Sequence, residues 1–468
     1  MRKILTEAMI EQACIDRLCP DKYDYINAFI EPDIVFSKDN ILESKEDGTG
    51  RRNIKEVVLP NVLLNSLKEI NPQIPSYILK DIVTNLKLHI SNKDLKDINY
   101  ENYKIIKDGI NVEYELDGEK KYDKVKIIAF NNPYRNTYTL VSQMWIKGEF
   151  QYRRPDLILF VNGLPLVFIE LKNSDVKLRT AYDKNLKDYI RDIPQLFFFN
   201  QFCVLSNGTE TRLGSFTAGY DHFFEWLRQS EDDKVDRKHI KEKGTSIEFL
   251  LDGLFEHETL LDYIENFILY ENKREKIIAK NHQFLGVNNL VEAFMNRETL
   301  DGKLGVFWHT QGSGKSYSMG MFVNKINRKI KGNFTFLMVT DRVDLDGQLY
   351  KNFLRTEVVT KDESSEPKSS KELREYLETN KPFIFTLIHK FGYDKGKKYP
   401  VLSERDDIVV IVDEAHRTQY KSFAQNMRTG LPNAQYIAFT GTPLLGSKRL
   451  TNQWFGDYVS EYNFAQSI

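Results

Sequence analysis

The chain has 468 residues, which is too long for one ordinary hydrophobic core and predicts two or three domains. Its 66 Lys and Arg residues nearly balance its 67 Asp and Glu residues, so net charge neither points to a polyanionic partner nor excludes one, and a DNA-binding surface would have to be a local stripe. Three cysteines are too few for a disulfide or metal-ligand framework, and no run reaches the roughly 18 apolar residues of a membrane span, so we expect a soluble, cytoplasmic protein without a membrane partner.

The first half of the chain predicts a mixture of helices and strands. Apolar residues at helical spacing predict helices over residues 5–18 and 76–91. Residues 103–130 are expected to form strands, with INVEYEL and KVKIIAF on either side of a DGEKK turn. A further helix is predicted over residues 181–192, followed by a short buried strand over residues 197–206.

The stretch RPDLILFVNGLPLVFIELKN, residues 154–173, predicts an apolar hairpin that has charged residues only at its ends. Its two apolar runs flank an Asn-Gly pair, which is a strong signal for a tight turn. Asp156 stands at the outer end of the first run, and Glu170 and Lys172 stand at the end of the second. Because Glu170 and Lys172 are two residues apart on one strand, their side chains point to the same face.

The register of this hairpin decides whether Asp156 reaches that face. A strict two-residue turn places Asp156 opposite Ile169, whereas a three-residue connection or an equivalent bulge places it opposite Glu170. We predict the second register. Two carboxylates at one rim form a hard oxygen site for Mg²⁺, and Lys172 beside them can polarise a phosphate or help to generate a hydroxide. The pattern therefore predicts a phosphodiester-cleaving site, and a surface ion pair at the strand ends is the alternative.

A charged stretch poor in large apolar residues, over residues 229–246, marks the predicted domain boundary. We expect a first domain over residues 1–228, a linker over 229–247 and a second domain over 248–460, with 461–468 beginning a further connection. In the second domain, the apolar strands KLGVFWH, NFTFLMVT, PFIFTLI, DIVVIVDE and AQYIAFTGT alternate with helical patterns. This alternation predicts an α/β fold with a doubly wound parallel sheet.

HTQGSGKSYSM, residues 309–319, predicts a phosphate-binding loop between a strand and a helix. Backbone N–H groups of such a loop close around phosphates, the Lys315 ammonium reaches the β- and γ-phosphates, and the Ser316 hydroxyl is available to Mg²⁺. The strict pattern begins with Gly, where this chain has His309. The residues expected to bind the nucleotide here are Thr310, Gln311, Gly312, Ser313, Gly314, Lys315 and Ser316.

Polar residues follow two further apolar strands of the second domain. Asp413 is expected to hold Mg²⁺ through water, and Glu414 to orient the water that attacks the γ-phosphate. The hydroxyls of Thr440 and Thr442, in AFTGTP, suit sensing of the nucleotide state. Gln283, upstream of the loop, could read adenine through its amide.

The loop, DEAH and TGTP, in this order, resemble the superfamily 2 helicase and translocase ATPases with a DEAH box, whose cofactors are ATP and Mg²⁺. The hairpin, as Pro155, Asp156, Glu170 and Lys172, resembles the mixed-sheet PD-(D/E)xK endonucleases. That resemblance implies an upstream acid, either Glu7 or Glu11. Its RecB-like branch has Gln-x-x-x-Tyr on a helix, which Tyr189 matches, whereas Asn185 replaces the Gln.

Both halves together resemble the restriction (R) subunit of a type I restriction-modification enzyme, over essentially the whole chain, with further matches at Asn136 and Gln143. The resemblance implies cleavage of double-stranded DNA coupled to ATP-driven translocation, in a complex with methyltransferase (M) and specificity (S) subunits. Since the match ends where the family's second RecA-like domain begins, we expect this chain alone to hydrolyse almost no ATP. The alternatives are a repair or other-class helicase-nuclease, and a non-catalytic DNA-binding or assembly module.

Overall fold

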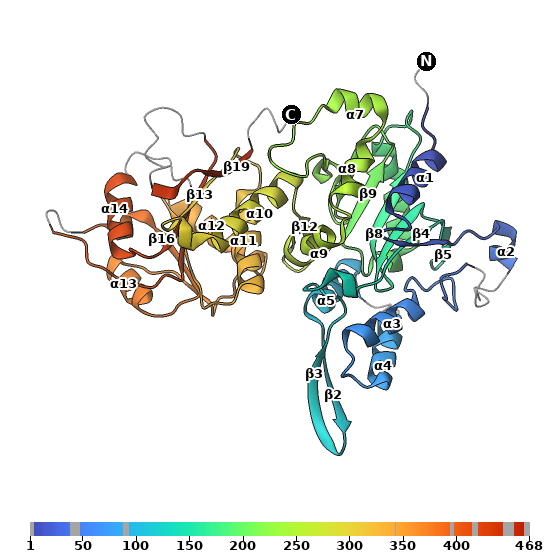
Figure 1. Ribbon diagram of the computed structural model, residues 1–468, viewed down its shortest axis with the longest axis horizontal. Coiled ribbons are helices and arrows are strands. Elements are labelled where there is room, and N and C mark those ends of the chain that lie inside the picture. Colours follow the sequence, from blue (N-terminus) through green and yellow to red (C-terminus); the bar gives the residue numbers. More distant parts are fainter. Residues whose placement is uncertain are drawn as a thin grey trace. The chain divides into compact units, whose positions relative to one another are not determined.

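The structure, a computed structural model, describes residues 4–37, 47–87, 93–341, 343–393, 397–413, 420–442 and 454–462 (Figure 1). The chain forms two compact units. The first contains Met1–Gln229, Asp233–Ile268 and Lys273–Ile278, and the second contains Ser230–Asp232, Leu269–Asn272 and Ala279–Ile468.

This division differs from the predicted boundary at residue 248. Three helices from residue 237 onward, the first of them inside the charged stretch expected to be a linker, belong to the first unit, because their apolar side chains, such as Leu250 and Leu260, are buried there. Arg17 of the first helix, α1 (Glu7–Leu18), also forms ion pairs with Glu248 and Asp252. The helices concerned are α7 (Arg237–Lys243), α8 (Ser246–Asp252) and α9 (His257–Asn266).

A six-stranded mixed sheet organises the first unit, in the order β1-β4-β7-β8-β9-β10. The pairs β1·β4 and β8·β9 are parallel, and the others are antiparallel. Every residue of the central strands β7 and β8 is buried, as expected for a strand pair covered on both faces. The strands are β1 (Asp24–Asn27), β4 (Tyr138–Ser142), β7 (Leu157–Val161), β8 (Leu164–Leu171), β9 (Phe202–Ser206) and β10 (Thr211–Gly214).

Helices around this sheet agree in part with the predicted ones. The first predicted helix is confirmed as α1, the second is confirmed up to Lys87, and residues 88–92 lie outside the described residues. The third consists of a π-helix over Ala181–Leu186 that continues as α6. The α-helices before α7 are α1 (Glu7–Leu18), α2 (Pro32–Ser37), α3 (Pro60–Ile70), α4 (Ser76–Lys87), α5 (Leu95–Asp108) and α6 (Lys187–Asp192).

The strands expected over residues 103–130 form a hairpin that is shorter and differently placed. It consists of β2 (Ile110–Leu116) and β3 (Glu119–Val125), which project from the rest of the first unit in Figure 1. The turn is the two-residue pair Asp117-Gly118, with φ of 54° and 78°, so EKK belongs to the strand. Residues 103–108 are helical, and residues 126–130 form no strand.

A seven-stranded sheet organises the second unit, in the order β15-β16-β14-β17-β18-β13-β19, with every pairing parallel. The predicted parallel sheet is therefore confirmed. Its strands are β13 (Lys303–His309), β14 (Thr335–Thr340), β15 (Ser364–Ser365), β16 (Phe383–Leu387), β17 (Ile408–Asp413), β18 (Gln435–Thr440) and β19 (Tyr458–Tyr462). The helices are α10 (Asn281–Met295), α11 (Lys315–Lys329), α12 (Val343–Arg355), α13 (Ser370–Glu378) and α14 (Tyr420–Gly430). The strands β11 (Ile268–Glu271) and β12 (Glu275–Ile278) lie where the chain passes between the units.

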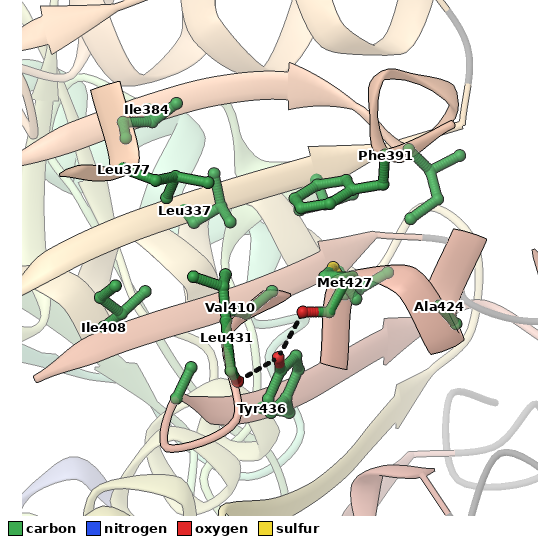
Figure 2. Close-up of a cluster of buried hydrophobic side chains, with 14 of the residues drawn as sticks. Leu337, Leu377, Ile384, Phe391, Ile408, Val410, Ala424, Met427, Leu431 and Tyr436 are labelled. Atoms are coloured by element: carbon green, nitrogen blue, oxygen red, sulfur yellow. Dashed lines mark hydrogen bonds between the residues drawn. The ribbon is translucent and has the colours of Figure 1, made fainter. Parts of the chain in front are cut away.

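An apolar cluster packs beneath one face of this second sheet (Figure 2). Leu337 and Val410, from the neighbouring strands β14 and β17, are fully buried there. The Tyr436 hydroxyl donates to the carbonyls of Met427 (3.2 Å) and Leu431 (2.9 Å), so the end of α14 is tied to β18. Burial of this face fixes the sheet whose carboxyl edge bears the nucleotide motifs.

In the described part of the chain, no helix combines the length and the apolar character that crossing a membrane requires.

Candidate active site

The β7–β8 hairpin has the predicted register, and a bulge produces it. Asn162 and Gly163 form a two-residue turn with φ of 52° and 79°, and Val161 pairs with Leu164. The pairing then shifts by one residue between Leu159 and Phe160, so that Leu157 lies opposite Ile169. Continued by one residue, this register brings Asp156 opposite Glu170. The bulge alternative is thus confirmed, and the three-residue connection is wrong.

Buried polar contacts hold the turn in place. The Asn162 amide donates to the Ile127 carbonyl (2.9 Å) and to Asn136 Oδ1 (2.8 Å), and its own oxygen accepts from Thr137 N (2.8 Å). A Cβ on Gly163 would lie 2.5 Å from the Leu59 carbonyl oxygen, so only Gly fits. Asn136 therefore has a structural role at this turn, which the sequence match alone did not reveal.

Asp156, Glu170 and Lys172 converge at the end of the hairpin. Lys172 Nζ donates to Glu170 Oε1 (2.8 Å) and to the Leu171 carbonyl (2.7 Å). Asp156 Oδ2 accepts from the Leu171 amide at 2.7 Å, which ties the two strands together at the carboxylates. Glu170 is 2% exposed, and its Oε2 is buried without a hydrogen-bond partner among the described residues.

Burial and mutual repulsion perturb the pKa values of this group. Burial and the charge of Asp156 together raise the pKa of Glu170 to about 8, against the opposing effect of Lys172. Burial also raises the pKa of Asp156, although the Leu171 amide and Lys172 act in the opposite direction. Burial lowers the pKa of Lys172, but the neighbouring carboxylates outweigh it, so the pKa is raised and the lysine stays charged.

These residues fit a divalent cation. A buried carboxylate oxygen without a partner is costly, and a cation beside Asp156 and Glu170 would satisfy it. The described residues contain no group of three or more His, Cys, Asp or Glu side chains arranged around one point. A cation held here would therefore take two carboxylates and complete its shell with water or main-chain oxygen, as Mg²⁺ commonly does.

Both candidate upstream acids on α1 lie near this group. Glu7 Oε1 is 3.7 Å from Lys172 Nζ. Glu11 Oε2 accepts from the side-chain Nε2 of Gln143 (2.5 Å), and the main-chain N–H of Gln143 donates to the Asp156 carbonyl (3.0 Å). Burial raises the pKa of Glu11, and the charge of Asp156 adds to the shift. Glu7 thus contacts the lysine, whereas Glu11 is linked to the Asp156 strand through Gln143.

Tyr189 supports the strand that carries Asp156. Its hydroxyl donates to the Arg154 carbonyl (3.1 Å), and its ring packs edge-on against Phe168 (5.2 Å between centroids). Burial, followed by the charges of Glu170 and Asp156, raises its pKa well above the usual value. Tyr189 therefore acts as a neutral hydrogen-bond donor, while Asn185 lies in the π-helix before it.

In the second unit, the predicted nucleotide motifs meet at one sheet edge. β17, β18 and β13 are adjacent and parallel, so Asp413, Thr440 and the loop after His309 all lie at carboxyl ends of neighbouring strands. The Thr440 hydroxyl accepts from the Thr442 amide (3.3 Å). Glu414 lies outside the described residues.

The loop itself has a shape suited to phosphate. Gly312 and Gly314 have φ of 83° and 87°, a conformation that L side chains rarely adopt. Lys315 begins α11, followed by Ser316, and its Nζ donates to the His309 carbonyl (3.3 Å). The loop residues Thr310, Gln311 and Ser313 connect β13 to this helix.

Gln283 lies against this loop instead of facing an open pocket. It is 4% exposed, its Nε2 donates to the Gly314 carbonyl (3.0 Å) and Ser318 Oγ (3.3 Å), and its Oε1 accepts from Lys280 N (2.9 Å). Adenine reading by Gln283 stays a prediction, and it would require this amide to exchange partners.

Comparisons with known proteins match two different families to the two units of the chain. Residues 4–222 match the family described as type I restriction enzyme R protein N terminus, and residues 282–468 match the SWI2/SNF2 ATPase family. The type I restriction enzyme HindI endonuclease subunit of Haemophilus influenzae is 35% identical, over 99% of this chain and 45% of its own length. The putative type I restriction enzyme MjaIXP endonuclease subunit of Methanocaldococcus jannaschii is 34% identical, over 98% of this chain and 44% of its own length.

The chain spans about half the length of the curated relatives it matches. Among solved structures, the UvsW helicase of bacteriophage T4 shares 13% identity, with a TM-score of 0.32 over 43% of this chain and 67% of that chain. The Type ISP restriction-modification enzyme LlaBIII bound to DNA shares 14% identity, with a TM-score of 0.31 over 41% of this chain and 16% of that chain. Scores this low support no conclusion.

Proposed function

Because the chain belongs to the family of type I restriction enzyme endonuclease subunits, we propose that it cleaves double-stranded DNA with a divalent cation and couples cleavage to ATP-driven translocation. The first unit is a PD-(D/E)xK nuclease domain, and the second is the first RecA-like domain of the motor. The partners are methyltransferase and specificity subunits in the cytoplasm.

The observation that carries the nuclease proposal is the convergence of Asp156 and Glu170 beside Lys172, which depends on the bulge in the hairpin. Asp156 and Glu170 hold Mg²⁺, which supplies Lewis-acid stabilisation of the phosphate when it is bound. Lys172, released from Glu170, places its ammonium against the phosphate charge. Tyr189 keeps the Asp156 strand in position, and Glu7 orients Lys172.

In the motor unit, the loop from Thr310 to Ser316 holds the ATP phosphates, with the Lys315 ammonium leaving the His309 carbonyl to contact them. Ser316 and Asp413 hold the Mg²⁺ of the nucleotide, and Thr440 and Thr442 respond to the γ-phosphate. Glu414 orients the attacking water.

The test of the nuclease proposal is nicking of supercoiled plasmid by the purified chain, alone and with methylation and specificity subunits, in Mg²⁺ or Mn²⁺. Nicking that Asp156→Asn abolishes and that Glu113→Gln, a substitution on the exposed β2 strand, leaves unchanged would support it. Nicking by Asp156→Asn at the unchanged rate would contradict it, because the activity would then come from a contaminant or another site.

One observation favours the alternative of a non-catalytic DNA-binding or assembly module: Lys172 Nζ donates to Glu170 Oε1 and to the Leu171 carbonyl, so the lysine already compensates the charge of this carboxylate. In that case the lysine neutralises the acids permanently. DNA binding without nicking by the complete complex, together with no Mn²⁺ binding, would establish this alternative.

A further inference from the structure

The first position of the phosphate loop is His309, where the strict pattern has Gly, and its side chain is engaged in a buried network. His309 is 0% exposed, and its Nε2 lies 2.6 Å from Ser460 Oγ on β19. The Ser460 hydroxyl in turn donates to Glu231 Oε1, and Glu231 Oε2 accepts from the Glu461 amide (3.1 Å). All of these residues belong to the second unit.

The hydroxyl fixes the proton position on the imidazole. Ser460 has a single hydroxyl hydrogen, which it donates to Glu231, so its oxygen accepts from His309. The proton of His309 is thereby assigned to Nε2. Two successive hydrogen bonds thus link His309 of the loop to Ser460 on β19, and Ser460 to the Glu231 carboxylate.

Two more contacts join the same strand to the loop. The Thr310 amide donates to the Tyr462 carbonyl (3.0 Å). The Tyr462 ring stacks on His282 at 3.7 Å between centroids, and His282 Nε2 is 3.3 Å from the Ser313 carbonyl. β19 therefore touches the loop at its first residue, its second residue and, through His282, its fifth.

The packing around Ser460 leaves no room for a larger neighbour. A Cβ on Gly286 of α10 would lie 2.4 Å from Ser460 Oγ and 2.8 Å from Phe307 Cε2. Gly286 thus allows α10 to approach closely enough to hold the Ser460 side chain against His309. The packing of Gly286 against Ser460 is independent of the hydrogen bonds to His309 and Glu231, and it restricts the position of the same Ser460 Oγ.

From these contacts we infer that His309 is a positioning residue for nucleotide binding, which anchors the phosphate loop to β19 through Ser460 and Glu231. The loop must keep its backbone N–H groups pointed at the phosphates while Lys315 moves from the His309 carbonyl to the ligand. The anchor holds the carbonyl that Lys315 leaves, so the loop does not collapse when the lysine departs. Preformed geometry of this kind reduces the conformational cost of binding.

The inference rests on the proposed nucleotide site, and binding of a fluorescent ATP analogue with Mg²⁺ to the purified chain tests both. Loss of one hydrogen bond in a buried network weakens binding by about three- to tenfold. We expect that loss for His309→Leu, His309→Asn, Ser460→Ala and Gly286→Ala. His309→Gln should restore near wild-type affinity, because its amide nitrogen reaches the position of Nε2, whereas the shorter Asn does not. His222→Leu, an exposed histidine of the first unit, is the matched control.

A double substitution makes the test sharper. If His309 acts through Ser460, His309→Leu with Ser460→Ala should bind no more weakly than His309→Leu alone. Thermal unfolding without nucleotide identifies any variant that has lost its fold, and the equally polar Gln and Asn variants then provide the comparison. Absence of binding by the wild-type chain would refute the nucleotide site itself. Wild-type binding with equal affinities for the Gln, Asn and Leu variants, or additive losses in the double variant, would refute the anchor.

Discussion

Metal binding beside Asp156 and Glu170 in the first unit is predicted to release a proton from Glu170, and this release can be quantified. An acid with a pKa of about 8 is ionised to roughly 1% at pH 6, about 10% at pH 7 and about half at pH 8. Since a cation binds the ionised carboxylate, its apparent affinity should rise about tenfold from pH 6 to pH 7 and about fivefold from pH 7 to pH 8. Binding at pH 7 should release about 0.9 proton.

The assay is isothermal titration of Mn²⁺ into the nucleotide-free chain, in buffers of different ionisation enthalpy at each pH. The pKa of Asp156 is raised, like that of Glu170. Protonation of Asp156 can therefore only steepen the rise of the apparent Mn²⁺ affinity with pH at the low end of the range. Glu170→Gln should abolish binding, and Glu113→Gln should leave it unchanged. A dissociation constant that is independent of pH between 6 and 8, with no proton released, would refute the reasoning, because Glu170 would then already be ionised.

The same shift has a consequence for stability. The folded pKa of Glu170 lies above its unfolded value of 4.5, so the protonated form is favoured in the native state. Without metal, stability should therefore fall as pH rises through the window from about 4.5 to about 8. Added Mn²⁺ should oppose this loss at the upper end of the window, since it binds only the folded site.

Three further predictions concern single substitutions. In a complete restriction complex, Lys172→Ala should reduce plasmid cutting by at least about a hundredfold and spare ATP hydrolysis, since the contacts of its ammonium, with Glu170, Glu7 and the Leu171 carbonyl, all lie in the first unit. Loss of both activities would contradict separate sites. In the same complete complex, Lys315→Ala should abolish ATP-driven translocation, measured by triplex displacement, and normal translocation would remove the phosphate-loop assignment. Gly163→Ala should destabilise the first unit by more than about 1 kcal/mol in thermal unfolding, because φ is +79° and the new Cβ would meet the Leu59 carbonyl; an unchanged midpoint would show that the turn can relax.

The hairpin shows how far sequence reasoning reached and where it stopped. The two-residue period of a strand shows that the strict Asn-Gly turn would put Asp156 and Glu170 on opposite faces, so the predicted shared face required a register offset by one residue. The sequence does not distinguish the two ways of reaching this register, a longer turn and a bulge. Pro165 was an available signal, because proline cannot donate to a strand ladder and occurs in interior strands mainly at bulges. It pairs with Phe160 at the shift in register.

Other features depend on tertiary contacts that have no local signature. The helices after residue 236 could not be assigned to a unit, because apolar helical patterns look alike wherever they pack. The strand β19 and its pairing with β13 join residues far apart in sequence, so the partner of His309 was not visible in the motif. Five of the seven parallel strands of the second unit, β13, β14, β16, β17 and β18, were predictable, because each is a nearly continuous apolar run. The short β15 and the mixed sequence of β19 carry no such signal.

The measurement that tests the central proposal most directly is anomalous diffraction from crystals of this chain soaked in Mn²⁺. We expect one peak at bonding distance from carboxylate oxygens of both Asp156 and Glu170, with Lys172 Nζ turned away from Glu170 Oε1. A peak that contacts neither carboxylate, or Mn²⁺ bound elsewhere while the Lys172–Glu170 contact persists, would contradict a metal-dependent nuclease site at the end of this hairpin.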